Sequence, residues 1–157
     1  MSVVIGAMSS LEYIYLGEYL YNTIFVPPDT EPPHRNVILK PEIYMYIDNF
    51  GGKAGDFGVV AEKDGYIIGA AWTRIIPGYG HIDDQTPELA ISVLPEYRGQ
   101  GIGTEMLSFL FELLIEQGYK QTSLSVQKAN PAARLYQRMG YKIIRENEED
   151  YIMAKEL

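Results

Sequence analysis

The positions of apolar residues divide this chain into short segments with the periodicity of helices or strands. Four segments repeat apolar residues every three or four positions or carry helix-start signals, which predicts helices over Ser10–Phe25, Pro41–Phe50, Gly101–Gln117 and Asn130–Met139. Seven others alternate apolar and polar residues or run apolar between turn signals, which predicts strands over Val3–Ile5, Phe57–Glu62, Tyr66–Ile76, Pro87–Leu94, Gln121–Val126, Tyr141–Arg145 and Tyr151–Lys155.

The predicted elements follow one another in the order β-α-α-β-β-β-α-β-α-β-β. This order predicts an α/β fold, an α+β mixed sheet that is partly antiparallel and has helices on both faces. Val26–Lys40 contains four prolines, which fix φ and disfavour helix in the preceding residue, so we expect an extended loop there. The short stretch before this loop cannot form a core alone, and 157 residues are typical of one domain. We therefore expect a single domain over residues 1–157.

Composition excludes several classes of protein. The chain is 46% hydrophobic and 22% charged, as soluble globular proteins are. The absence of cysteine excludes a disulfide framework, a thiolate zinc site and a cysteine nucleophile, and we expect no metal site. A net charge of −8 is unfavourable for binding nucleic acid. No apolar run approaches the ~18 residues of a membrane-spanning helix, and Met1–Gly6 lacks the charge and length of a secretory signal. We expect a soluble, cytoplasmic protein that binds neither nucleic acid nor membrane.

Charge is distributed unevenly along the chain. Residues 98–145 hold seven Lys or Arg against three Asp or Glu, a balance of +4, whereas residues 1–97 hold five against thirteen, a balance of −8. One explanation is chance, because both parts of the chain carry ordinary solvated surface charge. The alternative is that the basic stretch holds an anionic ligand.

A strand, a glycine-rich turn and a helix follow one another near residue 100. Glycine allows close approach of the backbone to a ligand, and a helix N-terminus attracts anions, so this element suits a phosphate group. The spacing of the glycines matches neither the P-loop nor the Rossmann fingerprint, and a plain structural turn remains the alternative. The turn consists of Arg98, Gly99, Gln100, Gly101, Ile102, Gly103 and Thr104.

A second motif begins at Asn130, which can cap a helix, with Pro131 in the first turn and Gly140 just after the end. Alone, it is a well-capped helix. Together, Arg98-x-x-Gly101-x-Gly103 and the run Asn130-Pro131-Ala132-Ala133-Arg134-Leu135-Tyr136-Gln137-Arg138-Met139-Gly140-Tyr141 resemble the GNAT superfamily of N-acetyltransferases. The resemblance is strongest over about Pro87–Tyr141. The N-terminal third, which usually shapes the acceptor site in that family, resembles it in general layout.

The resemblance implies acetyl-CoA (CoA) as cofactor and direct transfer of its acetyl group to a primary amine in a ternary complex. It places the pyrophosphate of the cofactor on the backbone N–H groups of the glycine-rich turn. It also places the pantetheine arm along the strand at Ile91 and Val93, with Asn130 bonded to the arm and Tyr136 near its sulfur.

The chemistry of acetyl transfer assigns further roles. Attack of an amine on the thioester produces an oxyanion, which a backbone N–H near Val93 would stabilise. Tyr136 would protonate the departing thiolate, because a phenol stays protonated at neutral pH; the alternative is a core aromatic residue. Glu88 would deprotonate the acceptor, as a glutamate at a comparable place does in several family members, although the family has no universal base. The alternative for Glu88 is a solvated acid at the end of a strand.

Two other functions remain open on the sequence. One is an acyl-CoA-binding module without turnover, and the other is a transferase for a longer acyl group. The acceptor, a small molecule or a protein, is expected to be cationic, because the acidic part of the chain supplies the elements around it. Relatives in the family include homodimers, and no segment of the sequence marks an interface.

Overall fold

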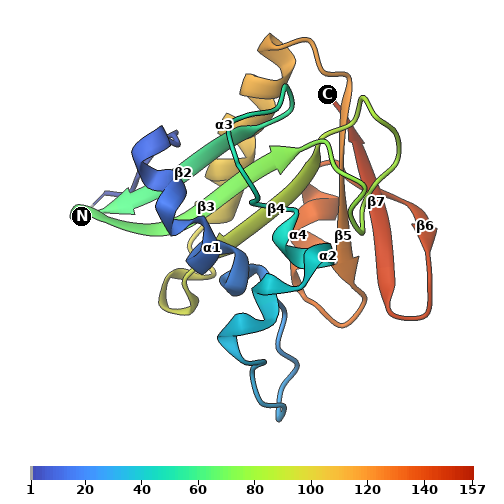
Figure 1. Ribbon diagram of the computed structural model, residues 1–157, viewed down its shortest axis with the longest axis horizontal. Helices are drawn as coiled ribbons and strands as arrows, with labels where there is room; N and C mark the ends of the chain where they lie inside the picture. Colours follow the sequence, from blue (N-terminus) through green and yellow to red (C-terminus); the bar gives the residue numbers. More distant parts are fainter. Residues whose placement is uncertain (1) are drawn as a thin grey trace.

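The computed structural model describes residues 2–157 and contains a seven-stranded mixed sheet with helices on both faces, which confirms the predicted α/β fold (Figure 1). The sheet has the order β1-β2-β3-β4-β5-β7-β6, and only the β4–β5 pair of this sheet is parallel. Each strand begins and ends within about two residues of its predicted bounds. The strands are β1 (Val4–Ala7), β2 (Phe57–Lys63), β3 (Tyr66–Arg74), β4 (Glu88–Val93), β5 (Gln121–Gln127), β6 (Lys142–Glu146) and β7 (Asp150–Glu156).

Two hydrophobic cores lie on opposite faces of the sheet. Because side chains alternate along a strand, Val59 of β2 packs into the core under α3, and its neighbour Val60 packs into the core that contains Leu16 and Leu20 of α1. The α-helices are α1 (Leu16–Thr23), α2 (Pro41–Tyr44), α3 (Ile102–Glu116) and α4 (Ala132–Arg138). Short 3-10 helices, η1 (Ser10–Tyr15), η2 (Arg35–Leu39) and η3 (Pro95–Tyr97), complete the helical segments.

The prediction of one helix over Ser10–Phe25 is wrong in its details. A 3-10 turn, η1, precedes α1, and α1 ends at Thr23. The difference follows packing: α1 buries three side chains, whereas η1 buries none and exposes Leu11 and Ile14. Ile24 and Phe25 consequently leave the helix in an extended segment.

The segment between α1 and β2 also differs from expectation. The predicted extended loop Val26–Lys40 contains η2, and the helix predicted over Pro41–Phe50 is regular only to Tyr44. Beyond Tyr44 the chain continues as hydrogen-bonded turns. The physical reason is competition for carbonyl groups, since side chains of β3 donate to the backbone of this segment. Among residues 2–157, no helix has the length and apolar character needed to cross a membrane.

Candidate active site

The parallel pair β4–β5 separates almost as soon as it forms. Its register contains one pair, Glu88 with Ser123, and the two strands diverge from there (Figure 1). The N–H of Leu94 donates to β3, so alternation along the strand turns the backbone groups of Ile91 and Val93 to the opposite edge, toward the gap. The gap therefore exposes a strand edge that can pair with a ligand.

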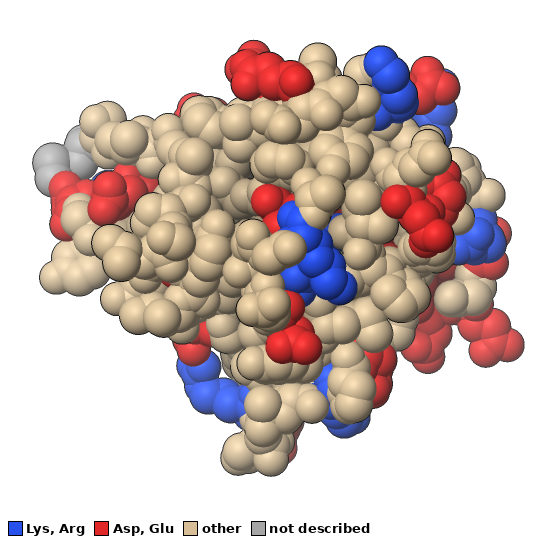
Figure 2. Space-filling model, turned by 45° about the horizontal axis from the view of Figure 1, so that its top comes forward, with Lys and Arg blue, Asp and Glu red and all other residues tan. Residues whose placement is uncertain are grey.

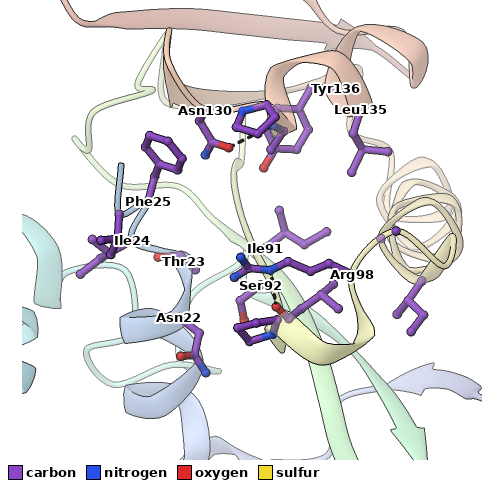
Figure 3. A pocket seen from close by; sticks show the side chains of 18 of the residues that line it. Asn22, Thr23, Ile24, Phe25, Ile91, Ser92, Arg98, Asn130, Leu135 and Tyr136 are labelled. Atoms are coloured by element: carbon purple, nitrogen blue, oxygen red, sulfur yellow. Dashed lines mark hydrogen bonds between the residues drawn. The ribbon is translucent and has the colours of Figure 1, made fainter. Parts of the chain in front are cut away.

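The larger of two cavities, about 780 Å³, lies in this gap between β4, the start of α3 and α4 (Figure 3). It brings together residues of both sequence motifs. Gln100 is not among the lining residues, and its side-chain amide contacts the carbonyl of Glu96 at 3.5 Å. The predicted site residues that line the larger cavity are Ile91, Val93, Arg98, Gly99, Gly101, Ile102, Gly103, Thr104, Asn130 and Tyr136.

The glycine-rich turn directs the N-terminus of α3 into the larger cavity. Gly99 and Gly101 have φ of +75° and +82°, a conformation that glycine adopts without steric cost. The first helical hydrogen bond runs from Glu105 N–H to Gly101 O, so the preceding N–H groups of the helix have no intrahelical partner. Arg98 and Arg138 are the only charged residues of the described chain on the walls of this cavity. The turn thus presents N–H groups and positive charge, as an anion requires.

Two predicted site residues reach the cavity from the second motif, Asn130 from just before α4 and Tyr136 from α4 itself. The Asn130 Oδ1 accepts a hydrogen bond from the Ala132 N–H at 2.9 Å, which fixes the side chain and leaves its Nδ2 to donate to a ligand (Figure 3). Tyr136 is 8% exposed and packs edge-on against Tyr141, with 6.0 Å between ring centroids. Burial raises the pKa of Tyr136, so the phenol stays protonated.

A smaller cavity of about 430 Å³ adjoins the larger one. Its walls include Tyr46, Tyr79 and two acidic residues, Glu149 of the β6–β7 turn and Asp150 at the start of β7, which are its only charged residues within the described chain. The two cavities share one wall, and Tyr136 belongs to it. The shared residues are Thr23, Ile24, Phe25, Ile91, Asn130 and Tyr136.

Glu88 lies outside both cavities. It is 2% exposed, so the alternative of a solvated strand-end acid is wrong. The carboxylate accepts hydrogen bonds from the Tyr46 hydroxyl at 2.7 Å and from the N–H groups of Gly78 and Gly80 at 3.1 Å each. Burial raises the pKa of Glu88, and these hydrogen bonds partly oppose the rise.

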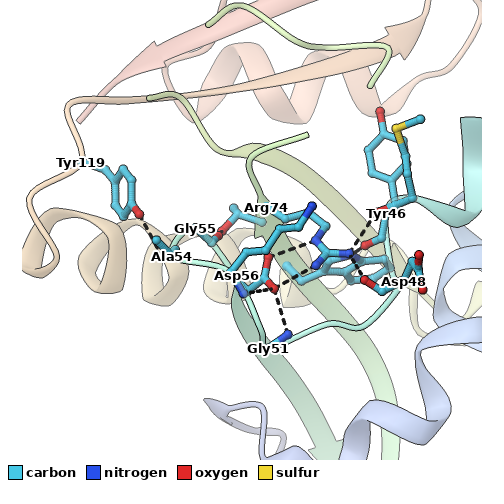
Figure 4. Close-up of polar contacts among 12 residues, drawn as sticks. Tyr46, Asp48, Gly51, Ala54, Gly55, Asp56, Arg74 and Tyr119 are labelled. Atoms are coloured by element: carbon cyan, nitrogen blue, oxygen red, sulfur yellow. Dashed lines mark hydrogen bonds and ion pairs between the residues drawn. The ribbon is translucent and has the colours of Figure 1, made fainter. Parts of the chain in front are cut away.

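Sequence reasoning missed the residues that hold the segment around Tyr46. The Arg74 guanidinium is 1% exposed and forms a two-pronged ion pair with Asp56, at 3.0 and 2.9 Å (Figure 4). The same guanidinium donates to the carbonyls of Met45 and Asp48. The only signal in the sequence was an arginine inside a mostly apolar predicted strand, which implies a buried partner.

Comparison with known proteins agrees with this geometry. The family model described as Acetyltransferase (GNAT) family matches residues 19–141. The chain is 32% identical over 130 residues to an N-alpha-acetyltransferase of Sulfurisphaera tokodaii, covering 73% of this chain and 77% of that protein. It is 29% identical over 102 residues to an S-alkylcysteine N-acetyltransferase of Bacillus subtilis, covering 59% and 54%. The PaiA N-acetyltransferase of Thermoplasma acidophilum, solved with coenzyme A, superposes with a TM-score of 0.71 at 22% identity over 100% of both chains.

Proposed function

We propose, from the premise that this chain belongs to the GNAT family of acetyltransferases, that it transfers an acetyl group directly to a primary amine in the smaller cavity. The chain is an N-acetyltransferase, and acetyl-CoA is its cosubstrate. One observation carries the proposal. The two cavities meet at a wall that contains Tyr136 and Ile91, so a thioester entering from one and an amine entering from the other would meet there.

The larger cavity has the features that CoA requires. The N-terminus of α3 and the side chains of Arg98 and Arg138 suit the pyrophosphate, and the open edge of β4 suits the amide groups of the pantetheine arm. The Arg98 Nε donates to the Val93 carbonyl at 3.0 Å, which leaves the Val93 N–H as the group of that residue available to an oxyanion. Because the chain has no cysteine, transfer through a cysteinyl intermediate is excluded.

The test is an amine panel that includes polyamines, aminoglycosides, amino acids and peptides with free N-termini. We expect release of the CoA thiol above background with at least one acceptor, and intersecting lines when both substrates are varied. Tight CoA binding without turnover would instead identify a binding module. A higher kcat/KM with butyryl-CoA than with acetyl-CoA would identify a transferase for longer acyl groups.

Replacing Gly101 with valine should weaken CoA binding at least tenfold, because a Cβ and two methyl groups would cover N–H groups of the turn. Loss of one charge-assisted hydrogen bond costs ~1.5–3 kcal/mol, which corresponds to a tenfold change or more. Isothermal titration of CoA measures the effect. Gly118→Val is the matched control: Gly118 has φ of +88°, Gly101 has +82°, and a Cβ at either position meets no atom within 4 Å. Equal CoA affinity in the two variants would contradict the phosphate assignment.

The acceptor is proposed to be cationic, since Glu149 and Asp150 are the charges on the smaller cavity. Burial, followed by the charges of Glu42 and Asp150, raises the pKa of Tyr79, which lines the same cavity. Figure 2 shows acidic and basic side chains interspersed on one face, and the opposite charges of the two cavities are therefore a local feature. Residues 98–145 supply both arginines of the larger cavity, as the interpretation of an anionic ligand for this stretch requires.

Neutralising these two carboxylates in the Glu149→Gln/Asp150→Asn variant should raise KM for a cationic acceptor about five- to thirtyfold, since each partly screened charge contributes ~0.5–1 kcal/mol. The KM for acetyl-CoA should stay unchanged. Glu148→Gln is the control, because Glu148 neighbours this pair and lines neither cavity. A preferred acceptor that is anionic, or rates that do not respond to ionic strength, would contradict the proposal.

A further inference from the structure

Glu88 is the candidate base, but an acceptor in the smaller cavity cannot contact it directly. An amine with a lysine-like pKa of ~10.4 arrives as an ammonium ion and must lose a proton before it attacks. Glu88 is buried at the start of β4, the strand that leads to Ile91 and Val93. Its side chain lines neither cavity. A group that contacts both the carboxylate and the smaller cavity could therefore carry the proton to Glu88.

Only one of the three donors to Glu88 can pass a proton. The N–H groups of Gly78 and Gly80 are backbone amides, which do not exchange protons in the range where side chains titrate. The third donor is the Tyr46 hydroxyl, which can give a proton to Glu88 and accept another on the same oxygen. Tyr46 also lines the smaller cavity, so its hydroxyl connects the Glu88 carboxylate with that cavity.

The fold holds Tyr46 in this position from several sides. The Trp72 Nε1 donates to the Tyr46 carbonyl at 2.9 Å, and the Tyr79 N–H donates to the Tyr46 hydroxyl at the same distance. The β3–β4 loop packs so closely that a Cβ on Gly78 would lie 2.5 Å from the Tyr46 hydroxyl and 2.9 Å from Glu88 Oε1. A side chain that only filled space would not need this many directed contacts.

We propose that Tyr46 is a catalytic residue that relays the acceptor's proton to Glu88, an inference that rests on the proposed function. The ammonium N–H gives its proton to the Tyr46 oxygen as the Tyr46 hydroxyl proton passes to Glu88. The amine becomes neutral, Glu88 becomes a neutral carboxylic acid, and Tyr46 remains a phenol throughout. The neutral amine then adds to the thioester carbonyl and forms the C–N bond of the tetrahedral intermediate. As the intermediate collapses, the C–S bond breaks, Tyr136 gives its proton to the thiolate, and the nitrogen gives up its second proton, which restores the Tyr136 phenol. Glu88 returns its proton to solvent by the same route after the product leaves.

Other ionisable groups surround this pair and must be separated from it. His81, on the β3–β4 loop, lowers the pKa of Glu88 when it is charged. Arg74 on β3 is the cross-strand partner of Glu88 in register and is itself paired with Asp56. Tyr79 of the same loop lines the smaller cavity and adds a phenol beside the pair, and its N–H donates to the Tyr46 hydroxyl. From β5, the neutral Ser123 faces Glu88 in register.

The test is the pH dependence of kcat/KM for Tyr46→Phe with an amine acceptor from the panel. At neutral pH we expect a loss of about 10²-fold, the lower end of the range for general acid–base catalysis. The loss should shrink to within about threefold as pH approaches the pKa of the acceptor, because the amine is then already neutral. A loss of the same size at every pH would mean that Tyr46 is merely structural and would overturn the relay.

Two further variants complete the experiment. Glu88→Gln should show the same loss and the same recovery with pH, and the Tyr46→Phe/Glu88→Gln double variant should be no slower than either single variant, because both act in one step. Tyr44→Phe is the control, since Tyr44 lies on the same segment and lines neither cavity. Repeating the profile in a His81→Gln background separates His81 from Glu88: the recovery with pH should persist there, and its disappearance would assign the proton to His81 instead.

A measurement without turnover tests the pairing itself. Infrared titration of the protonated carboxyl band, assigned by its absence in Glu88→Gln, should show a higher pKa for Glu88 in Tyr46→Phe, because the lost hydrogen bond stabilised the carboxylate. An unchanged titration would overturn the contact on which the relay depends. Failure of the proposed function is distinguishable: wild-type protein would then show no turnover with any amine, whereas failure of the relay leaves wild-type turnover intact.

Discussion

Replacing Tyr136 with phenylalanine is expected to lower kcat by 10²- to 10⁴-fold, the range for loss of a general acid. The thiolate that leaves the tetrahedral intermediate needs a proton, and Tyr136 is the phenol on the wall shared by the two cavities. The variant keeps the ring, and with it the edge contact to Tyr141 and the packing under α4. Rates at saturating acetyl-CoA measure kcat, and CoA affinity should change little.

Tyr141→Phe is the matched control for this prediction. Tyr141 is buried beside Tyr136, with 2% exposure, but it lines neither cavity. Losing its hydroxyl should therefore leave kcat within a few-fold of wild type. Equal rates for the two variants would mean that Tyr136 is the core aromatic residue that the sequence also allowed.

The pH dependence of kcat tests the role of Tyr136 independently. Burial raises the pKa of Tyr136 above the ordinary phenol value of ~10, so the acid form persists to higher pH in the folded protein. The wild-type kcat should therefore not fall on the alkaline side until pH exceeds ~10. A fall between pH 8 and 9 that is retained in Tyr136→Phe would show that another group supplies the proton.

The parts of the site that could be predicted are those whose geometry is encoded locally. Gly101 predicts a left-handed turn because few other residues adopt φ of +82° without strain, and the helix that follows begins at the next residue. The Asn130 side chain accepts a hydrogen bond from the N–H of Ala132, the first residue of α4, only two residues away in sequence. The resemblance to the GNAT superfamily joined the two motifs to one cofactor, because neither local signal determines the order of the strands in the sheet.

The acceptor side could not be predicted because its contacts join distant segments. Tyr46 and Glu88 are 42 residues apart, and no periodicity or turn signal links them. The position of Tyr46 depends on Trp72 and Arg74 donating to carbonyls of its segment, which is also why the helix predicted over Pro41–Phe50 ends early. Hydrogen-bond competition of this kind depends on tertiary packing and leaves no mark on the apolar pattern.

The buried pair Arg74–Asp56 leads to the largest predicted effect on stability. Asp56→Asn should lower the free energy of unfolding by about 3–5 kcal/mol, because it leaves the Arg74 charge buried without its counter-ion. Both side chains are at most 1% exposed. Domains of this kind have a total stability of ~5–15 kcal/mol, so the loss is a large fraction of it. Urea unfolding followed by fluorescence measures the difference.

Glu18→Gln is the control for this measurement. It breaks the Arg35–Glu18 ion pair, whose side chains are 64% and 51% exposed, and it should lower stability far less than Asp56→Asn does, because solvent screens an exposed pair. The comparison holds the chemistry of the pair constant and varies its burial. Similar losses in the two variants would contradict the assignment of the Asp56 effect to an uncompensated buried charge.

A variant that lacks both charges of the Arg74–Asp56 pair should be more stable than a variant that lacks only the Asp56 charge. In the Arg74→Met/Asp56→Asn double variant no charge is left unpaired, so its loss should be smaller than that of Asp56→Asn alone. Activity should not recover with it, because methionine cannot donate to the Met45 and Asp48 carbonyls that hold the Tyr46 segment. We therefore expect a folded double variant whose kcat/KM at neutral pH is lowered in the same way as that of Tyr46→Phe. A double variant with wild-type activity would show that the ion pair stabilises the fold without positioning Tyr46.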